Sequence, residues 1–336
     1  MKLIGVVLGK VSCILVSYNH SLYIRESLMA FLNQDTSYFD VEFIVSDDCS
    51  TDNTVQIVQE ELAHLPLGKN VKFFAREKNL GLIKHLNTVI ESATGDFIIV
   101  SAADDINFSN RIQVAVKAMI DNDVSLICSD GIIIDQDGNK KSRLFASTKS
   151  APTLEKIFRS GLIGLPGAGF AFRKEIFTKF GPLPSNIENE DDQWPVRALL
   201  MRGIYVINEP LFYYRTHDAS LSSWTWSTSA KSKELSKRYE KNLHNRLSHF
   251  LNWEKISEAS GKVTIKERVL LGRRIELYKR ILSSKSFLDR ILLLKYIFIM
   301  TMKEILFLFF GVKSCLIERE IEKAKLFIKK IIHKIG

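Results

Sequence analysis

The sequence predicts an α/β fold built on a mainly parallel, doubly wound sheet. Short apolar runs alternate with segments of helical periodicity through the first half of the chain, and three of these runs end in polar or acidic clusters. Such alternation is typical of strands joined by helical crossovers. From about residue 228 the pattern changes to helices alone, which predicts a C-terminal all-helical extension. We therefore expect one domain over residues 1–228 and a helical region over residues 229–336.

Each expected strand is a short β-rich run, and each expected helix has apolar residues three or four positions apart. In the first half we expect strands at 11–16, 41–45, 71–74 and 97–100, and helices at 21–34, 54–62 and 82–93. Further along, we expect strands at 124–128, 132–134, 170–172, 204–207 and 211–214, and a helix at 194–202.

Polar side chains follow three expected parallel strands, at Tyr18-Asn19, at Asp47-Asp48 and at Asp104-Asp105. Parallel strands end at one edge of a sheet, where open α/β sheets bind ligands. Two adjacent carboxylates at this edge favour a divalent cation and a phosphate. Aspartates also suit helix N-caps, so either acid at 104–105 fits capping of a helix over 107–121, and the pair at 47–48 fits capping of the helix at 54.

A second acidic cluster, Glu188-Asn189-Glu190-Asp191-Asp192, opens the expected helix at 194–202. The helix macrodipole favours acids in a first turn, which accounts for one or two of them. The remaining acids point to a functional site. The glycine-rich segment at 161–169 precedes this cluster, and it predicts either a loop packed closely on a ligand or a mobile connector.

Charge is distributed unevenly along the chain. Residues 231–336 hold 25 of the 47 basic and 11 of the 38 acidic side chains, which leaves 22 basic and 27 acidic ones in residues 1–230. This asymmetry predicts an acidic catalytic part and a basic region that meets an anionic surface. Aromatic residues are not interleaved with the basic ones, which argues against nucleic acid as the partner.

An anionic membrane surface is the expected partner of the C-terminal helices. Residues 315–334 form a basic amphipathic pattern suited to a membrane interface, although a helix packed on its own domain with a solvated basic face fits as well. The apolar segment 287–312 is interrupted by charges, so we do not expect it to span a membrane. The scattered cysteines at 13, 49, 128 and 315 and the short N-terminal apolar run predict a cytoplasmic protein without a signal peptide.

Over residues 10–225 the chain resembles the family 2 glycosyltransferases of the GT-A fold, especially those that build bacterial O-antigens and capsules. The segments that carry the resemblance are VSYN at 16–19, VSDDCSTD at 45–52, NLG at 79–81 with KHLN at 84–87, AADD at 102–105, ED at 190–191 and YRTH at 214–217. Two positions depart from the family pattern. Ala102 replaces the first acid of the Asp-x-Asp motif, and Cys49 stands where glycine is usual.

The resemblance implies a nucleotide-sugar site formed by Ser17, Tyr18, Asn19, Asp47, Asp48, Lys84, Asp104, Asp105 and Arg215. It implies a divalent cation, Mn²⁺ or Mg²⁺, held by Asp104 and His217. The catalytic base is expected at Asp191, with Glu190 or Asp192 as the other candidates. Lys84, Arg215 and His217 each have an ordinary alternative, namely a solvated lysine, a surface salt bridge and a structural histidine.

The expected function is that of an inverting glycosyltransferase in bacterial surface polysaccharide biosynthesis. It would move a sugar from a nucleotide-sugar donor to a saccharide or lipid-linked acceptor, as a peripheral protein at the inner face of the cell membrane. The alternative is a catalytically impaired nucleotide-sugar-binding or scaffolding protein of the same fold. Ala102 is the feature that supports this alternative.

Overall fold

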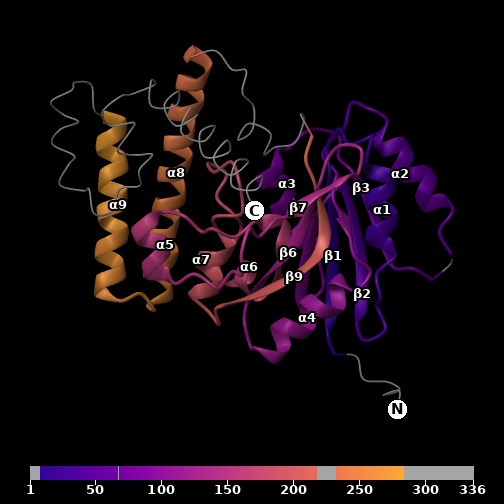
Figure 1. Cartoon of the computed structure of the whole chain (residues 1–336), viewed down its shortest axis with the longest axis horizontal. Coiled ribbons are helices and arrows are strands. Elements are labelled where there is room, and N and C mark those ends of the chain that lie inside the picture. The colour runs from indigo at the N-terminus through magenta and orange to yellow at the C-terminus, as the bar shows by residue number, and fades with distance from the viewer. Residues whose placement is uncertain (1–7, 67, 218–231, 284–336) are drawn as a thin grey trace, which may run out of the picture. The chain divides into compact units, whose positions relative to one another are not determined.

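The computed structural model describes residues 8–66, 68–217 and 232–283, which form two compact units (Figure 1). The first unit holds the described residues of Met1–Thr153 and Ile163–Trp226. The second holds those of Leu154–Leu162 and Ser227–Gly336. Composition predicts a boundary near residue 228, but nothing in it marks residues 154–162 as part of the second unit.

A single mixed sheet forms the centre of the first unit. Its strand order is β3-β2-β1-β4-β8-β6-β9-β5, with β7 paired to β6. The strands are β1 (Lys10–Ser17), β2 (Asp40–Asp47), β3 (Val71–Ala75), β4 (Phe97–Ala102), β5 (Ile106–Asn107), β6 (Leu126–Ile134), β7 (Lys140–Arg143), β8 (Phe170–Arg173) and β9 (Ile204–Arg215).

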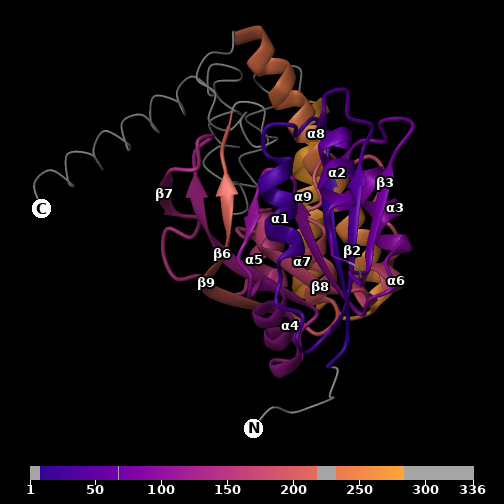
Figure 2. The same cartoon turned by 90° about the vertical axis from the view of Figure 1, so that its right-hand side faces the viewer.

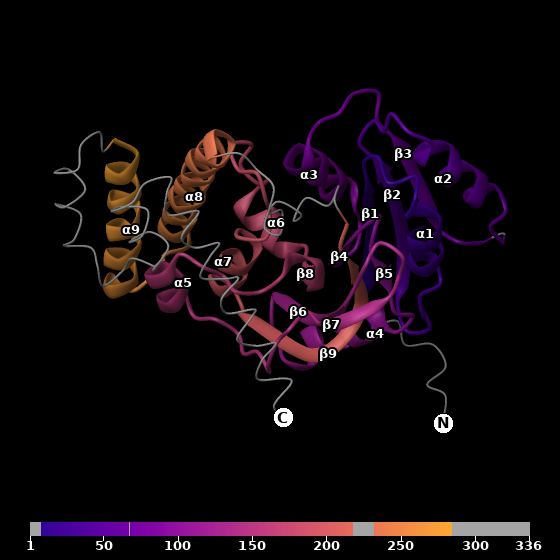
Figure 3. The same ribbon diagram turned by 45° about the horizontal axis from the view of Figure 1, so that its top comes forward.

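The helices of the first unit connect these strands. They are α1 (Ile24–Leu32), α2 (Thr54–Ala63), α3 (Leu82–Ser92), α4 (Arg111–Asp121), the 3₁₀ turn η1 (Gly167–Gly169), α6 (Glu175–Phe180) and α7 (Trp194–Leu199). Helices α1 and α2 lie side by side on one side of β1–β3, and α3 lies on the other (Figure 3). The predicted alternation of strands and helices is therefore confirmed.

The parallel part of the sheet brings the predicted polar clusters to one edge. β1 pairs in parallel with both β2 and β4, and β2 pairs in parallel with β3. Ser17, the last residue of β1, lies opposite Asp47, the last residue of β2, and Val16 lies opposite Ala102 at the end of β4. The mainly parallel, GT-A-like sheet flanked by helices matches the predicted fold class.

Burial on both faces explains why these strands are nearly continuous apolar runs. One face of β1 packs in a buried core against α1 and α4, formed in part by Val11, Cys13, Leu15, Ile24, Leu28, Phe31, Ile112, Val116 and Met119. Completely burying one such side chain contributes about 1.5–3 kcal/mol. The core therefore holds the strand ends of the polar edge on a rigid base.

The two short strands expected at 204–207 and 211–214 are one continuous strand, β9, which runs beside β6 (Figure 2). Pro210 between them resembles a strand breaker in the sequence. In the structure it lies opposite Asp130, where the β6–β9 register shifts, so its missing N–H interrupts no regular ladder. The segments expected at 124–128 and 132–134 likewise belong to one strand, β6.

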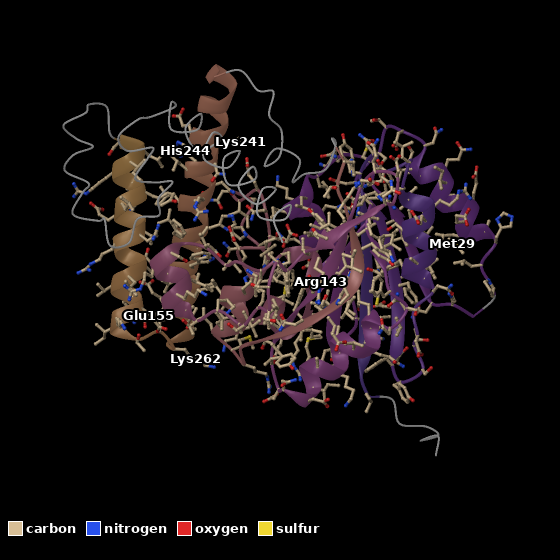
Figure 4. The ribbon with its side chains drawn as sticks, viewed as in Figure 1. Met29, Arg143, Glu155, Lys241, His244 and Lys262 are labelled. Carbon is tan, nitrogen blue, oxygen red and sulfur yellow. The ribbon has the colours of Figure 1, made fainter. Side chains whose placement is uncertain are left out.

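The second unit is helical in its described part, as expected. It contains α5 (Leu154–Ser160), α8 (Ser232–Ser260) and α9 (Ile265–Ser283). Phe158 of α5 lies 6.0 Å from Trp253 of α8 between ring centroids. Glu155, labelled in Figure 4, pairs with Lys266 of α9 at 2.9 Å. Residues 154–162 thus belong to the helical unit, although the segments before and after them in the sequence belong to the first unit.

In the described part of the chain, no helix has the length and apolarity needed to cross a membrane. The amphipathic pattern at 315–334 and the apolar segment at 287–312 lie outside the described residues. Three thiols, those of Cys13, Cys49 and Cys128, are free among the described residues, as the scattered spacing predicts.

Candidate active site

Asp47 ties the loop after β2 to the end of β1. This fully buried carboxylate accepts hydrogen bonds from the Ser17 hydroxyl at 2.7 Å and from the Ser50 backbone N–H and hydroxyl at 2.7 and 2.6 Å. Asp52, not Asp47, accepts the N–H and hydroxyl of Thr54 at the start of α2, at 3.0 and 2.5 Å. Both oxygens of Asp47 therefore have protein donors, and the side chain shapes the loop.

Asp48 fixes the start of α3. Its Oδ1 accepts the Leu80 N–H at 2.8 Å, and its Oδ2 accepts the Gly81 N–H at 2.9 Å. The Asn79 amide donates to the Asp48 carbonyl at 3.0 Å. Lys84 is exposed in the first turn of α3. The NLG and KHLN segments are thus placed beside the acidic loop by Asp48 itself.

Two residues of this edge adopt left-handed backbone conformations. Asn19 has a φ of 57° and Cys49 a φ of 66°. The Asn19 side chain accepts the Thr51 N–H at 2.8 Å, which joins the β1 and β2 loops. Glycine adopts positive φ without steric cost, and cysteine does not. The backbone alone therefore explains why glycine is usual at position 49. Tyr18, between the two loops, remains 45% exposed.

Asp104 and two histidines converge beyond the end of β4. The His217 Nε2 and the Asp104 Oδ2 form a 3.1 Å hydrogen bond, and the His20 Nε2 lies 4.0 Å from the same oxygen. Burial acts to raise the pKa of Asp104, but the His217 hydrogen bond outweighs it and holds the pKa below its usual value. Asp104 is therefore an ionised acid flanked by two imidazoles.

The neighbouring acid, Asp105, is a structural group. It is 4% exposed, and its Oδ1 accepts the Arg215 backbone N–H at 3.0 Å. Burial, together with the charge of Asp104, raises its pKa well above the usual value. The pKa values of the two adjacent acids are therefore shifted in opposite directions, and Asp104 is the more exposed of the two.

Arg215 is oriented toward the protein. Its Nε donates to the Asp104 carbonyl at 3.0 Å, Nη1 to the Gln136 carbonyl at 3.1 Å and Nη2 to the Glu26 carboxylate at 2.6 Å. The side chain is 3% exposed and its guanidinium lies 4.9 Å from the centre of the Tyr23 ring. In this arrangement every guanidinium nitrogen has a protein acceptor, so Arg215 holds the YRTH segment against the end of β4.

Glu190 and Asp191 form a half-buried acid pair before α7. Burial raises the pKa of Asp191 well above its usual value, and the Glu190 charge raises it further. Burial raises the pKa of Glu190 too. The Gly167 N–H donates to Asp191, and a Cβ atom added at Gly167 would lie 1.7 Å from Asp191 Oδ1. At Gly167 the glycine-rich segment thus packs closely on an acid of the same chain.

Arg111, at the start of α4, joins the two acidic clusters. Its Nη2 donates to the Ala168 carbonyl at 2.7 Å, next to Gly167, and its Nη1 donates to Asn107 Oδ1 at 2.6 Å. It is 2% exposed, and its charge acts on Asp105. Sequence analysis missed this residue. The available signal was a cation on the otherwise apolar face that continues with Ile112, Ala115, Val116 and Met119.

The predicted residues therefore separate into two groups. Asp104 and His217 come together as expected, and His20 joins them without having been predicted. Asp47, Asp48, Asp105 and Arg215 lie at the expected edge but are engaged in protein hydrogen bonds. In the described part of the chain, no group of three His, Cys, Asp or Glu side chains is arranged to hold a metal ion.

Comparison with known proteins agrees with this architecture. The sequence model of the glycosyl transferase family 2 matches residues 12–181. The putative teichuronic acid biosynthesis glycosyltransferase TuaG of Bacillus subtilis is 26% identical over 223 residues, 66% of this chain and 84% of TuaG. The dTDP-rhamnosyl transferase RfbG of Shigella flexneri is 25% identical over 235 residues, 66% of this chain and 78% of RfbG.

The fold is also shared with a solved structure. TarS 1–349 of S. aureus, crystallised in complex with UDP-GlcNAc, aligns with a TM-score of 0.58 and 18% identity, covering 91% of this chain and 89% of that one. The family model covers half of the chain and includes the loops around Asp47, Asp48 and Asp104. The chain therefore belongs to glycosyl transferase family 2 and is a glycosyltransferase with a GT-A-like fold.

Proposed function

We propose that this glycosyltransferase moves a sugar, with inversion, from a nucleoside diphosphate donor to a saccharide acceptor in bacterial surface polysaccharide biosynthesis. TuaG and RfbG, named for teichuronic acid biosynthesis and for dTDP-rhamnosyl transfer, support the reaction class. With the UDP-GlcNAc bound to TarS, they make UDP- and dTDP-sugars the first donors to test. The observation that carries the mechanism is the Arg111 bridge, in which Arg111 donates to Asn107 of β5 and to Ala168 in the loop against Asp191.

Asp191 is the proposed base. It takes the proton of an acceptor hydroxyl while that oxygen attacks the anomeric carbon and the bond from that carbon to the diphosphate oxygen breaks. The leaving nucleoside diphosphate departs with the bonding electron pair. A single displacement of this kind inverts the anomeric centre, as in inverting glycosidases. The raised pKa of Asp191 makes its ionised form a stronger base than an ordinary aspartate.

Asp104 and His217 fit a divalent cation as two of its protein ligands. A carboxylate oxygen and an imidazole nitrogen, 3.1 Å apart, are donors that Mn²⁺ accepts, and Mg²⁺ also binds through few carboxylates together with substrate phosphates. When bound, the cation would neutralise charge on the departing diphosphate. Ala102, at the end of β4, adds no oxygen ligand, so most of the coordination falls to the donor and to water.

The remaining donor contacts are assigned to the exposed rim of the same edge. Tyr18 is exposed there and is available for stacking on the nucleobase or ribose of the donor. Lys84 is an exposed basic residue on α3. Two hydrogen bonds stabilise the loops of this rim. Asn19 accepts the Thr51 N–H, and the Ser17 hydroxyl donates to Asp47.

The acceptor is proposed to be lipid-linked, with the protein peripheral on the inner face of the cell membrane. The excess of basic residues in 231–336 supports this proposal. Full-length protein should float with vesicles containing anionic lipid and not with zwitterionic ones, and 1 M salt should release it. Flotation that ignores lipid charge, or retention on DNA at physiological salt, would contradict the proposed surface.

The test of catalysis compares Asp191→Asn with Asp121→Asn in the full chain. We expect Asp191→Asn to lower turnover by at least about a hundredfold while the affinity for UDP or dTDP is unchanged, because removing a general base costs 10²–10⁴. Asp121→Asn, at the exposed end of α4, serves as the control, because Asp192 is itself a candidate for the base. Full turnover by Asp191→Asn would overturn the assignment of the base.

Metal dependence is tested with Asp104→Asn and His217→Gln. Both should weaken the Mn²⁺-dependent part of nucleotide binding, measured by calorimetry, whereas Asp121→Asn on the exposed end of α4 should not. Ala102 favours one alternative, a nucleotide-sugar-binding protein without turnover. Donor binding without transfer or hydrolysis under every acceptor condition would support that alternative.

A further inference from the structure

His20 is held rigidly at the edge of the donor site. Its backbone N–H donates to the Thr54 hydroxyl at 2.8 Å, and its carbonyl accepts the N–H groups of Tyr23 and Ile24 at 2.9 Å. The residue is therefore anchored to the start of both α1 and α2. Its imidazole is 21% exposed and extends toward Asp104. A side chain on such a base loses little freedom when it binds a ligand.

The hydrogen bond at Nδ1 determines the tautomer of His20. The backbone N–H of Tyr18 donates to Nδ1 at 3.2 Å. A nitrogen that accepts a hydrogen bond carries no hydrogen, so the ring is neutral and its hydrogen is on Nε2. The Tyr18 N–H is rigid backbone, and it enforces this assignment whatever approaches the other side of the ring.

The Nε2 hydrogen has no acceptor among the described residues. The nearest carboxylate oxygen, Asp104 Oδ2, is 4.0 Å away, beyond hydrogen-bond distance. That oxygen is already engaged by His217 at 3.1 Å. A half-buried donor therefore points at the acidic edge with its hydrogen available for an incoming acceptor.

We propose that His20 donates its Nε2 hydrogen to a phosphate oxygen of the nucleoside diphosphate. This inference rests on the proposed function, which places the diphosphate at the Asp104 edge. A phosphate oxygen is the acceptor that fits, because Asp104 and His217 would hold the proposed cation, and with it the diphosphate, at this edge. Charged acceptors also make the stronger hydrogen bonds. His20 is then a donor-binding residue that acts beside the cation.

The same geometry separates His20 from the metal ligands. Metal binding at Nε2 would move the ring hydrogen to Nδ1, where it would oppose the Tyr18 N–H. The Nε2 of His217, in contrast, lies 3.1 Å from Asp104 Oδ2, the other proposed metal ligand. The contribution of His20 to nucleotide affinity is therefore expected in chelator as well as in Mn²⁺.

Two substitutions at position 20 distinguish the ring nitrogens. The Gln amide nitrogen reaches the place of Nε2, whereas the Asn amide nitrogen reaches only the place of Nδ1. We expect His20→Gln to bind UDP nearly as tightly as wild type, and His20→Asn and His20→Ala to bind about tenfold more weakly, the loss typical of one hydrogen bond to a charged group. His64→Gln, at the exposed end of α2, is the matched histidine control.

Calorimetric titrations with UDP and with uridine, each in EDTA and in Mn²⁺, complete the test. Uridine affinity should be the same in all variants, because it lacks phosphate. Equal losses for uridine and UDP, or a loss seen only with Mn²⁺, would overturn the phosphate contact. A wild-type protein that binds neither UDP nor dTDP overturns the proposed donor and this inference together. If wild type binds UDP and His20→Ala binds it equally well, the inference alone fails.

A spectroscopic measurement reads the His20 tautomer directly in the wild-type protein. Long-range ¹H–¹⁵N correlation spectra of histidine-labelled protein report which ring nitrogen carries the hydrogen. With His20→Gln used for assignment, the His20 ring should appear as the Nε2–H tautomer in the free protein and remain so with UDP. An Nδ1–H tautomer in the free protein would overturn the proposal.

Discussion

The carboxyl group of Asp191 lies against the Cα of Gly167, so closely that no side chain fits between them. A Cβ atom at position 167 would be 1.7 Å from Asp191 Oδ1 and 2.2 Å from its carboxyl carbon. The Gly167 N–H also donates to that carboxylate. The proposed base is thus positioned by the absence of a side chain on the facing loop, and Arg111 holds that loop through Ala168.

Gly167→Ala should therefore displace Asp191 without touching the donor edge. We expect turnover to fall about a hundredfold, as for a reacting group moved by about 1 Å, while UDP affinity stays at the wild-type value. Gly272→Ala, where nothing lies within 4 Å of the added carbon, is the control. Wild-type turnover by Gly167→Ala would show that Asp191 is not the base or that the loop moves freely.

The pH dependence of turnover should depend on Glu190. The Glu190 charge helps to raise the pKa of Asp191, and a base must be deprotonated to act, so turnover should rise with pH through that raised pKa. Glu190→Gln removes the charge and should shift the acid limb of the profile to lower pH. Rate profiles from pH 5 to 9 measure the shift, and a limb that moves upward or stays in place would contradict it.

Arg215→Lys should destabilise the first unit. The guanidinium donates to three backbone carbonyls and to Glu26, and the lysine ammonium cannot reproduce that planar arrangement. Because Glu26 is 62% exposed, the pair itself contributes little, and we expect a loss of about 2 kcal/mol in unfolding free energy, mainly from the carbonyls. Urea denaturation measures it, with the half-exposed Arg202→Lys as control. Unchanged stability with weaker UDP binding would instead place Arg215 on phosphate.

Glu42 should make folding stability depend on pH in acid. Burial of this 1% exposed carboxylate acts to raise its pKa, but hydrogen bonds from Lys72, Ser12 and Thr94 outweigh it and lower the pKa to about 2. Since the folded pKa lies below the ordinary value, the stabilisation is fully present above about pH 4.5 and is lost as pH falls toward 2.

Glu42→Gln tests this prediction. At pH 7 we expect the variant to be less stable by roughly 3 kcal/mol, because the pKa of Glu42 is lowered to about 2 in the folded protein. The difference from wild type in urea denaturation should shrink steadily between pH 4.5 and pH 2.5. A difference that is constant over this range would mean that packing, not ionisation, sets the contribution of Glu42.

Cys49→Gly should stabilise the protein. The left-handed φ of 66° destabilises a residue with a Cβ by about 1–2 kcal/mol. Glycine avoids this steric cost but loses more backbone entropy on folding, which offsets part of the gain. We expect a net gain of about 0.5–1 kcal/mol in urea denaturation. Cys49→Ala keeps the Cβ and should show no gain, so equal stabilisation by both variants would trace the effect to the thiol.

The sequence by itself determined the order of strands and helices and the edge at which the site forms. Strands buried on both faces must be apolar throughout. Parallel pairing of β1 with β2 and β4 then brings together the residues that follow positions 16, 47 and 102 at the ends of these strands. Local pattern suffices for this, because period and turn chemistry act over a few residues. The acid at 104 was predicted in this way, whereas the histidine at 217 was predicted only from the family resemblance.

Only the tertiary structure decided how the polar side chains at that edge are used. The sequence suggests that Asp47, Asp48 and Arg215 are available to bind a ligand. In the structure their side chains instead form hydrogen bonds with protein groups from other elements. Packing also made β9 one strand and placed residues 154–162 in the helical unit. The contact of Asp191 with Gly167 and the orientation of His20 depend in the same way on distances between separate elements. The periodicity of a sequence indicates which face of a helix or strand is buried. Which other element packs against that face is determined only by the tertiary structure.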